Sequence, residues 1–150
     1  MSHNFSRTML AVFSGLLALS LTPAWAHHSF EAEFNSEKLV AVTGVLTRVE
    51  WSNPHIYFYV DAKEKNGKVA TWTFEGSNTG PIRRAGTERK DFVSNYGKVI
   101  TVLACPAKVT ARRGAAEQVK LPDGRLIAAG GKRYKGEDRE AIMQAAFKAN

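Results

Sequence analysis

Apolar and polar residues alternate along several stretches after residue 37, and this alternation predicts a mainly β protein. Segment 55–61 shows it most clearly, because Ile56, Phe58 and Val60 share one face of an extended chain. The alternation and the turn residues between its repeats predict strands over residues 38–51, 55–61, 68–76, 97–104, 116–121 and 125–128. Short helical turns are expected over 81–84 and 88–93, and a helix over 137–149.

Three strands, a short helical link and two or three further strands is the order of elements in an OB-type barrel. We therefore expect a small OB-like barrel of five to six strands with a short helical link and a C-terminal helix. Segment 38–51 is apolar on both faces in places and contains Gly44. Such a strand is typical of a bend or bulge where a barrel closes.

The register of the hairpin between residues 55 and 76 follows from keeping one face apolar. A two-residue loop would place Phe58 opposite Glu75 and so mix core with charge. A three-residue loop over 65–67, with Gly67 left-handed, places Phe58 opposite Phe74. We predict the second register.

That register also decides the opposite face of the hairpin. It sets Tyr57 across from Glu75 and Tyr59 across from Thr73, and it leaves His55 diagonally close to Glu75. Polar and aromatic side chains would therefore gather at one end of the sheet.

The first 26 residues have the features of a secretory signal peptide. Arg7 precedes the apolar run 9–21, and small residues stand at Ala24 and Ala26. The run is too short to span a bilayer comfortably, and the small residues favour cleavage over an uncleaved anchor. We expect a periplasmic or secreted protein with no transmembrane segment after cleavage. Removal of 26 of the 150 residues, with Arg7, would leave 124 residues and a net charge of +6.

The expected organisation is a signal peptide over 1–26, the barrel over 27–131, and a basic loop with a C-terminal helix over 132–150. The single cysteine, Cys105, excludes a disulfide within the chain. It lies in an apolar strand, so we expect it to act as a small buried residue.

Three histidines remain after cleavage, and two of them, His27 and His28, begin the mature chain. An N-terminal histidine offers a metal its α-amino group and a ring nitrogen in one chelate. A third nitrogen from His55 would complete a set that suits Cu(II). His28 would be an alternative or extra ligand, and Glu75 or Tyr57 an outer group. The ligand set resembles the histidine brace of copper oxygenases and some copper-binding proteins.

The copper site requires the N-terminal segment to fold back toward His55. Residues 29–34 alternate in a way that suits an added edge strand, with Phe30 and Phe34 holding it in place. Two other interpretations stay open. The pair His27-His28 could chelate copper locally without His55, or it could be a polar start of the chain that binds no metal.

The chain resembles a family of secreted bacterial proteins catalogued as domain of unknown function 6152. The similarity lies in Ala26-His27-His28-Ser29-Phe30, Glu33-Phe34, Gly44-Val45, Val49-Glu50-Trp51-Ser52-Asn53-Pro54-His55, Trp72-Thr73-Phe74-Glu75, Pro106-Ala107 and Leu121-Pro122-Asp123-Gly124. It runs to about residue 127 and leaves the tail from Lys132 onward outside. The resemblance implies export and no established activity.

A binding module is the rival class. OB-type barrels bind ligands on the face of their second and third strands, where Tyr57 and Tyr59 would lie. Basic pairs such as Arg83-Arg84 and Arg112-Arg113 would favour an anionic or glycan ligand. Export argues against nucleic acid. The chain carries no nucleophile elbow, phosphate loop or zinc-protease motif, so enzymatic activity stays open and a non-catalytic role is favoured.

Overall fold

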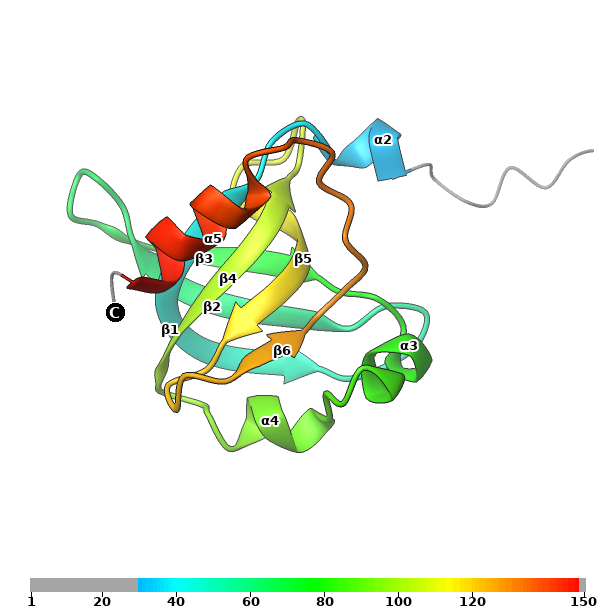
Figure 1. The fold of residues 1–150 in the computed structure, drawn as a ribbon. Coiled ribbons are helices and arrows are strands. Elements are labelled where there is room, and N and C mark those ends of the chain that lie inside the picture. Colours follow the sequence, from blue (N-terminus) through cyan, green and yellow to red (C-terminus); the bar gives the residue numbers. More distant parts are fainter. Residues whose placement is uncertain (1–29, 149–150) are drawn as a thin grey trace, which may run out of the picture.

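The computed structural model describes residues 30–148 and shows the mainly β architecture that the sequence predicts (Figure 1). Six strands form one sheet: β1 (Val40–Glu50), β2 (Tyr57–Lys63), β3 (Val69–Glu75), β4 (Val99–Pro106), β5 (Arg113–Lys120) and β6 (Leu126–Ala128). Within residues 30–148, four helices accompany them: α2 (Phe30–Glu33), α3 (Thr79–Arg84), α4 (Arg89–Val93) and α5 (Arg139–Lys148).

The sheet closes into a five-stranded barrel. Its strand order is β3-β2-β1-β4-β5-β6, and β3 also pairs with β5. The β3–β5 pair is parallel, with Thr73 opposite Arg113 and Glu75 opposite Ala115, whereas the other pairs are antiparallel. This closure, with β6 as an extra strand, confirms the small OB-like barrel expected from the order of elements.

Strand β1 contains an irregularity that explains its apolar residues on both faces. Val42 and Leu46 are buried, and so is Val49, which has the opposite parity. The register with β2 shifts between Leu46 and Arg48, so the pleat reverses there and Val49 also faces the core. Gly44, where the bend was expected, lies three residues from the shift. Its missing side chain lets the backbone of Asp61 approach closely.

The hairpin of β2 and β3 has the predicted register. Phe58 pairs with Phe74, Tyr57 with Glu75 and Tyr59 with Thr73. Gly67 has a φ of 83°, the left-handed conformation that the three-residue loop requires. The rings of Phe58 and Phe74 stack with their centroids 5.4 Å apart inside the barrel.

Helices α3 and α4 link β3 to β4 and lie at one end of the barrel (Figure 1). Glu88 and Asp91 form a capping box at the start of α4, in which the Asp91 carboxylate accepts a bond of 2.8 Å from the Glu88 backbone N–H. Phe92 of α4 is fully buried, with its ring 5.1 Å from that of Phe58. The helical link therefore closes this end of the core.

The expected edge strand over residues 29–34 is wrong for the residues that the structure describes. Residues Phe30–Glu33 form the short helix α2, and only Phe34 makes an isolated bridge, to Ala107. The Phe34 N–H donates to the Phe30 carbonyl at 2.8 Å, which closes one helical turn. A spacing of four residues places both rings on the same side of a turn. They contact each other at 5.3 Å and pack near Cys105.

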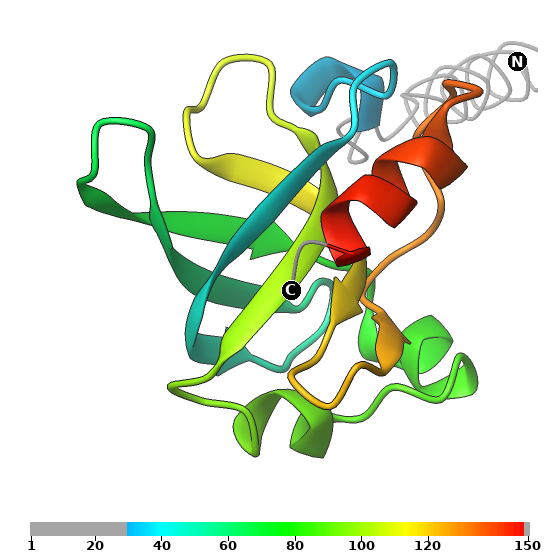
Figure 2. The ribbon, with the colours of Figure 1, turned by 60° about the vertical axis from the view of Figure 1, so that its left-hand side comes forward.

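The C-terminal tail returns across the barrel before α5 (Figure 2). The buried carboxylate of Glu117 accepts hydrogen bonds from the backbone N–H groups of Arg133 and Tyr134, both at 2.6 Å. It also forms an ion pair with Arg139. The Lys120 ammonium donates to the Phe147 carbonyl at 2.5 Å. Hydrogen bonds at both ends thus hold the predicted C-terminal helix against the barrel. No helix in the range 30–148 has the length and apolar character needed to cross a membrane.

Candidate functional site

His55 lies just before β2, after the turn through the cis peptide bond Asn53–Pro54. The Asn53 side chain holds this turn by accepting 3.0 Å bonds from the backbone N–H and hydroxyl of Thr79. The His55 Nδ1 atom lies 3.0 Å from the carbonyl oxygen of Gly76. A carbonyl can only accept, so Nδ1 carries the proton and, in the neutral ring, Nε2 carries the lone pair.

Glu75 lies beside this ring, as the hairpin register predicts. One carboxylate oxygen is 3.4 Å from His55 Nδ1. The other accepts the Tyr57 hydroxyl at 3.2 Å and the Arg113 guanidinium at 2.8 Å. Burial, followed by the neighbouring Glu75 charge, raises the pKa of Tyr57 above its ordinary value. The structure therefore brings together His55, Glu75 and Tyr57, three residues that the sequence singled out.

Arg113 is the neighbour that sequence analysis missed. Its guanidinium bridges Glu75 and Glu33 of α2, at 2.8 and 3.0 Å, and lies over the ring of Phe34 with its carbon 5.3 Å from the centroid. Burial alone would lower its pKa, but the two carboxylates outweigh burial and hold the pKa above its ordinary value. In the sequence Arg113 was one member of a basic pair, with no local sign of these partners.

A small hollow of about 60 Å³ lies against His55 and Glu75. Four parts of the chain form its walls: the end of the hairpin (Gly76, Ser77), the segment around α2 (Phe30, Phe34), strand β5 (Ala115, Ala116) and the tail (Gly130, Arg133). The Arg133 guanidinium also lies over the Phe30 ring, 5.4 Å from its centroid. Residues near both ends of the described chain therefore meet beside His55.

The predicted ligands His27 and His28 lie outside the described residues. Across residues 30–148 the structure places no group of three or more His, Cys, Asp or Glu side chains in a position to hold a metal ion. Within this part of the chain, His55 is the sole histidine. Any further histidine ligand for a metal at His55 would therefore come from outside residues 30–148.

Tyr57 and Tyr59, the residues of the alternative ligand face, lie on the outward side of β2 with their hydroxyls bonded within the chain. The Tyr59 hydroxyl donates to Glu50 at 3.1 Å, and the Arg48 guanidinium lies 4.0 Å from its ring centroid. The Arg48 guanidinium also pairs with the Glu50 carboxylate at 3.0 Å, so this positive charge has a carboxylate neighbour. Binding of an anionic or glycan ligand on this face stays a prediction.

Cys105 is fully buried in β4, as expected for a small apolar position. Burial, with the nearby Glu117 carboxylate, raises the pKa of its thiol to about 12. The thiol is therefore neutral at physiological pH, and it cannot act as a metal-binding thiolate without structural change.

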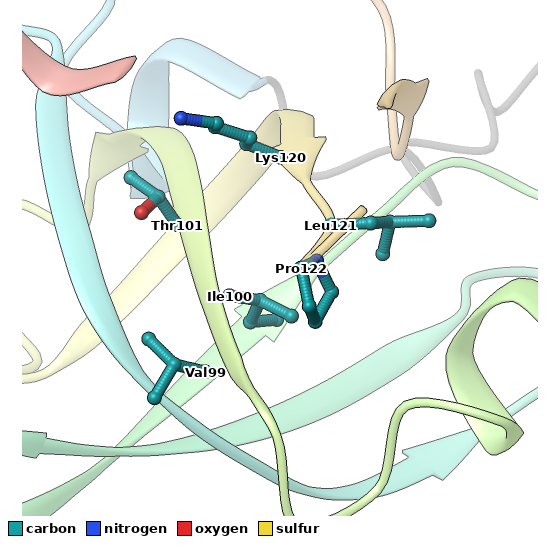
Figure 3. Close-up of a pocket in the computed structure, with 6 residues that line it drawn as sticks. All are labelled: Val99, Ile100, Thr101, Lys120, Leu121 and Pro122. Atoms are coloured by element: carbon teal, nitrogen blue, oxygen red, sulfur yellow. The ribbon is translucent and has the colours of Figure 1, made fainter. Parts of the chain in front are cut away.

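A larger hollow, of about 350 Å³, lies where β4 passes the end of β5 (Figure 3). It is lined by Val99, Ile100, Thr101, Lys120, Leu121 and Pro122. None of the predicted site residues lines this hollow. Lys120 at its edge is bonded to the Phe147 carbonyl of α5, so this hollow adjoins the C-terminal helix.

The barrel topology and the surroundings of His55 define the class of protein. It is a small OB-like β-barrel in which His55 and its acidic neighbours lie where the segment around α2 meets the β2–β3 hairpin. The chain belongs to a family of unknown function (DUF6152), whose model matches residues 15–117. The matched region includes β1 to β4, His55, Glu75 and Arg113, and it ends within β5. A search of curated proteins finds no match to this chain.

Proposed function

We propose that the protein is exported, that cleavage after Ala26 leaves His27 as the first residue, and that the mature protein binds Cu(II). His27 supplies its α-amino and ring nitrogens, and His55 supplies a third nitrogen. His28 is an alternative or extra ligand, and Glu75 is an outer group that orients His55. The observation that carries the proposal is the position of Phe30, three residues after His27, in the wall of the hollow that His55 also lines.

The orientation of the His55 ring supports this role. Metal-binding histidines commonly donate their second ring N–H to a carbonyl or carboxylate, which fixes the ring and leaves the other nitrogen for the metal. His55 has both kinds of acceptor at Nδ1, the Gly76 carbonyl at 3.0 Å and Glu75 at 3.4 Å. Its side chain is 45% exposed, so the ring borders solvent.

The distance along the chain also supports the proposal. Three residues span at most about 10 Å when fully extended, at 3.3–3.6 Å per residue. The proposal requires His27 to lie within this length of Phe30, which borders the same hollow as His55. Nitrogen ligands in tetragonal arrangement favour Cu(II), and deprotonating an α-amino group with a pKa of about 7.7–8.0 costs little at neutral pH.

The test is Cu(II) titration, with electron paramagnetic resonance, of protein that has been exported and cleaved so that His27 is the true N-terminus. We expect tight binding and a three-nitrogen tetragonal spectrum. His55→Ala should remove the third nitrogen and weaken binding. A sample with one extra residue before His27 should lose the amine ligand. Tyr59→Ala, a neighbouring change outside the ligand set, should leave the titration and the spectrum unchanged.

Two results would contradict the proposal. Binding that survives His55→Ala with an unchanged spectrum would show only a local His27-His28 chelate. Absence of tight binding by the cleaved wild-type protein would exclude the copper-binding function. The alternative would then be a ligand bound on the face of Tyr57 and Tyr59. Ligand binding on that face should be sensitive to Tyr59→Ala and, for an anion, to salt.

A further inference from the structure

Three segments that are distant in sequence meet at Arg113. Its guanidinium donates to Glu33 at the end of α2 and to Glu75 on β3, which is the carboxylate beside His55. The three side chains are partly buried: Arg113 is 29% exposed, Glu33 is 35% exposed and Glu75 is 15% exposed. Partly buried charge-assisted bonds of this kind are stronger and less screened than surface ion pairs.

We propose that Arg113 is a positioning residue that docks α2, the element that follows residues 27–29 in the chain, beside His55. This inference rests on the proposed copper function, because positioning matters for the metal only if His27 is a ligand. Arg113 is not itself a ligand, since its cationic guanidinium has no lone pair to offer a metal. Its contribution is to keep α2 at a fixed distance from His55, through Glu33 on one side and Glu75 on the other.

The attachments of α2 show why this one bridge matters. The helix has a single turn, and an isolated helix of that length is unstable in water. Its other contacts lead elsewhere: the Glu33 carbonyl accepts the Lys108 N–H at 2.9 Å, and Glu31 bonds Ser36 and Lys135. Arg113 alone among these partners also contacts a carboxylate that faces His55. It therefore links the docking of α2 to the surroundings of the metal-binding ring.

Two variants separate the halves of the bridge. Arg113→Gln removes both bonds, whereas Glu33→Gln weakens only the bond to α2 and leaves Arg113 on Glu75. Matched controls are Arg112→Gln, which breaks the 2.7 Å pair with Glu64 away from this hollow, and Glu37→Gln on the exposed turn after α2. The controls change the same charges at nearby positions without altering the Glu33–Arg113–Glu75 bridge.

The first measurement is hydrogen exchange of the metal-free protein, followed at the amides of Phe34 and Asn35. These amides bond to the carbonyls of Phe30 and Pro106 at 2.8 and 2.9 Å and so report on α2 docking. We expect exchange to be roughly tenfold faster or more in Arg113→Gln and Glu33→Gln than in the wild type or either control. Unchanged exchange in both variants would overturn the docking role.

The second measurement is the Cu(II) titration with its spectrum. Loss of a group that orients ligands weakens metal binding by about 10–100-fold, so we expect a loss in that range and an altered spectrum for both variants. Faster exchange with unchanged affinity and spectrum would overturn the positioning of ligands, while the copper function would stand. If the wild type fails to bind copper, the copper function fails, and the exchange measurement still decides whether Arg113 docks α2.

Discussion

The His55 Nδ1 atom donates to the carbonyl oxygen of Gly76, 3.0 Å away, across the open end of the β2–β3 hairpin. Two further bonds hold the same place: the Gly76 N–H donates to the Ile56 carbonyl at 2.8 Å, and the Ile56 N–H donates to the Ser77 carbonyl at 3.2 Å. The backbone around Gly76 therefore fixes both the end of the hairpin and the orientation of the histidine ring.

Gly76→Ala is expected to destabilise the protein by about 1–3 kcal/mol, because overpacking a tight interior site costs that much. A Cβ atom at Gly76 would overlap the Ala129 carbonyl oxygen and lie 2.6 Å from Ile56 Cγ1. Urea unfolding measures the change. Gly80→Ala in α3 is the control: its Cβ would meet nothing closer than 3.4 Å, so it should be neutral or stabilising by up to ~1 kcal/mol. Equal effects of the two changes would refute the steric argument.

Cys105 should resist alkylation while the protein is folded. Its thiol pKa is about 12 against an ordinary 9.0, and the side chain is buried. At pH 9 the folded protein therefore holds at least about a hundredfold less thiolate than the unfolded chain. Iodoacetamide labelling followed by mass spectrometry, with and without urea, measures the difference. Labelling that is equally fast in both conditions would show that the thiol is accessible in the folded state.

The contact between α2 and the tail should weaken in acid. The Lys135 ammonium, at 2.6 Å, and then the Ser36 hydroxyl lower the pKa of Glu31 below its ordinary 4.5. A depressed folded-state pKa stabilises the fold above pH 4.5, and that stabilisation is lost as the pH falls through the lower folded value.

A pH series of urea unfolding on the wild type and Lys135→Gln tests this. Their difference in stability should be constant above pH 4.5 and should shrink below it. Lys132→Gln, which changes an exposed lysine in the same loop, should show no such pH dependence. A difference that grows in acid would have the wrong sign for this pair.

Glu117→Gln should release the C-terminal tail. The buried carboxylate of Glu117 pairs with Arg139, and removing one partner of a buried pair leaves an uncompensated charge that costs about 3–5 kcal/mol. Arg139 is 18% exposed, so we expect the lower part of this range or less. Limited trypsin digestion should cut faster after Lys132, Arg133 and Lys135.

Glu140→Gln, a change of the same charge on α5, is the matched control and should leave the digestion pattern unchanged. If Glu117→Gln is cut no faster than Glu140→Gln, the tail is held by its other contacts, such as the bond between Lys120 and the Phe147 carbonyl.

Local patterns in the sequence were sufficient for most of the barrel. Alternation of apolar residues gave the strands, and the requirement that Phe58 face an apolar partner gave the hairpin register that places Glu75 beside His55. These features depend on neighbours a few residues apart. The same local information was ambiguous for α2, because Phe30 and Phe34 share one side in a strand and in a helical turn alike.

Tertiary structure alone decided which distant residues meet at the candidate site. Arg113 reaches Glu75 because β3 and β5 pair in parallel to close the barrel, an arrangement that joins segments 38 residues apart. It reaches Glu33, 80 residues away, because α2 packs against the same edge. The sequence by itself determined the strands, the turns and the histidines. The closure of the sheet determined the charged partners around His55, since no periodic pattern records contacts between strands that meet only when the barrel forms.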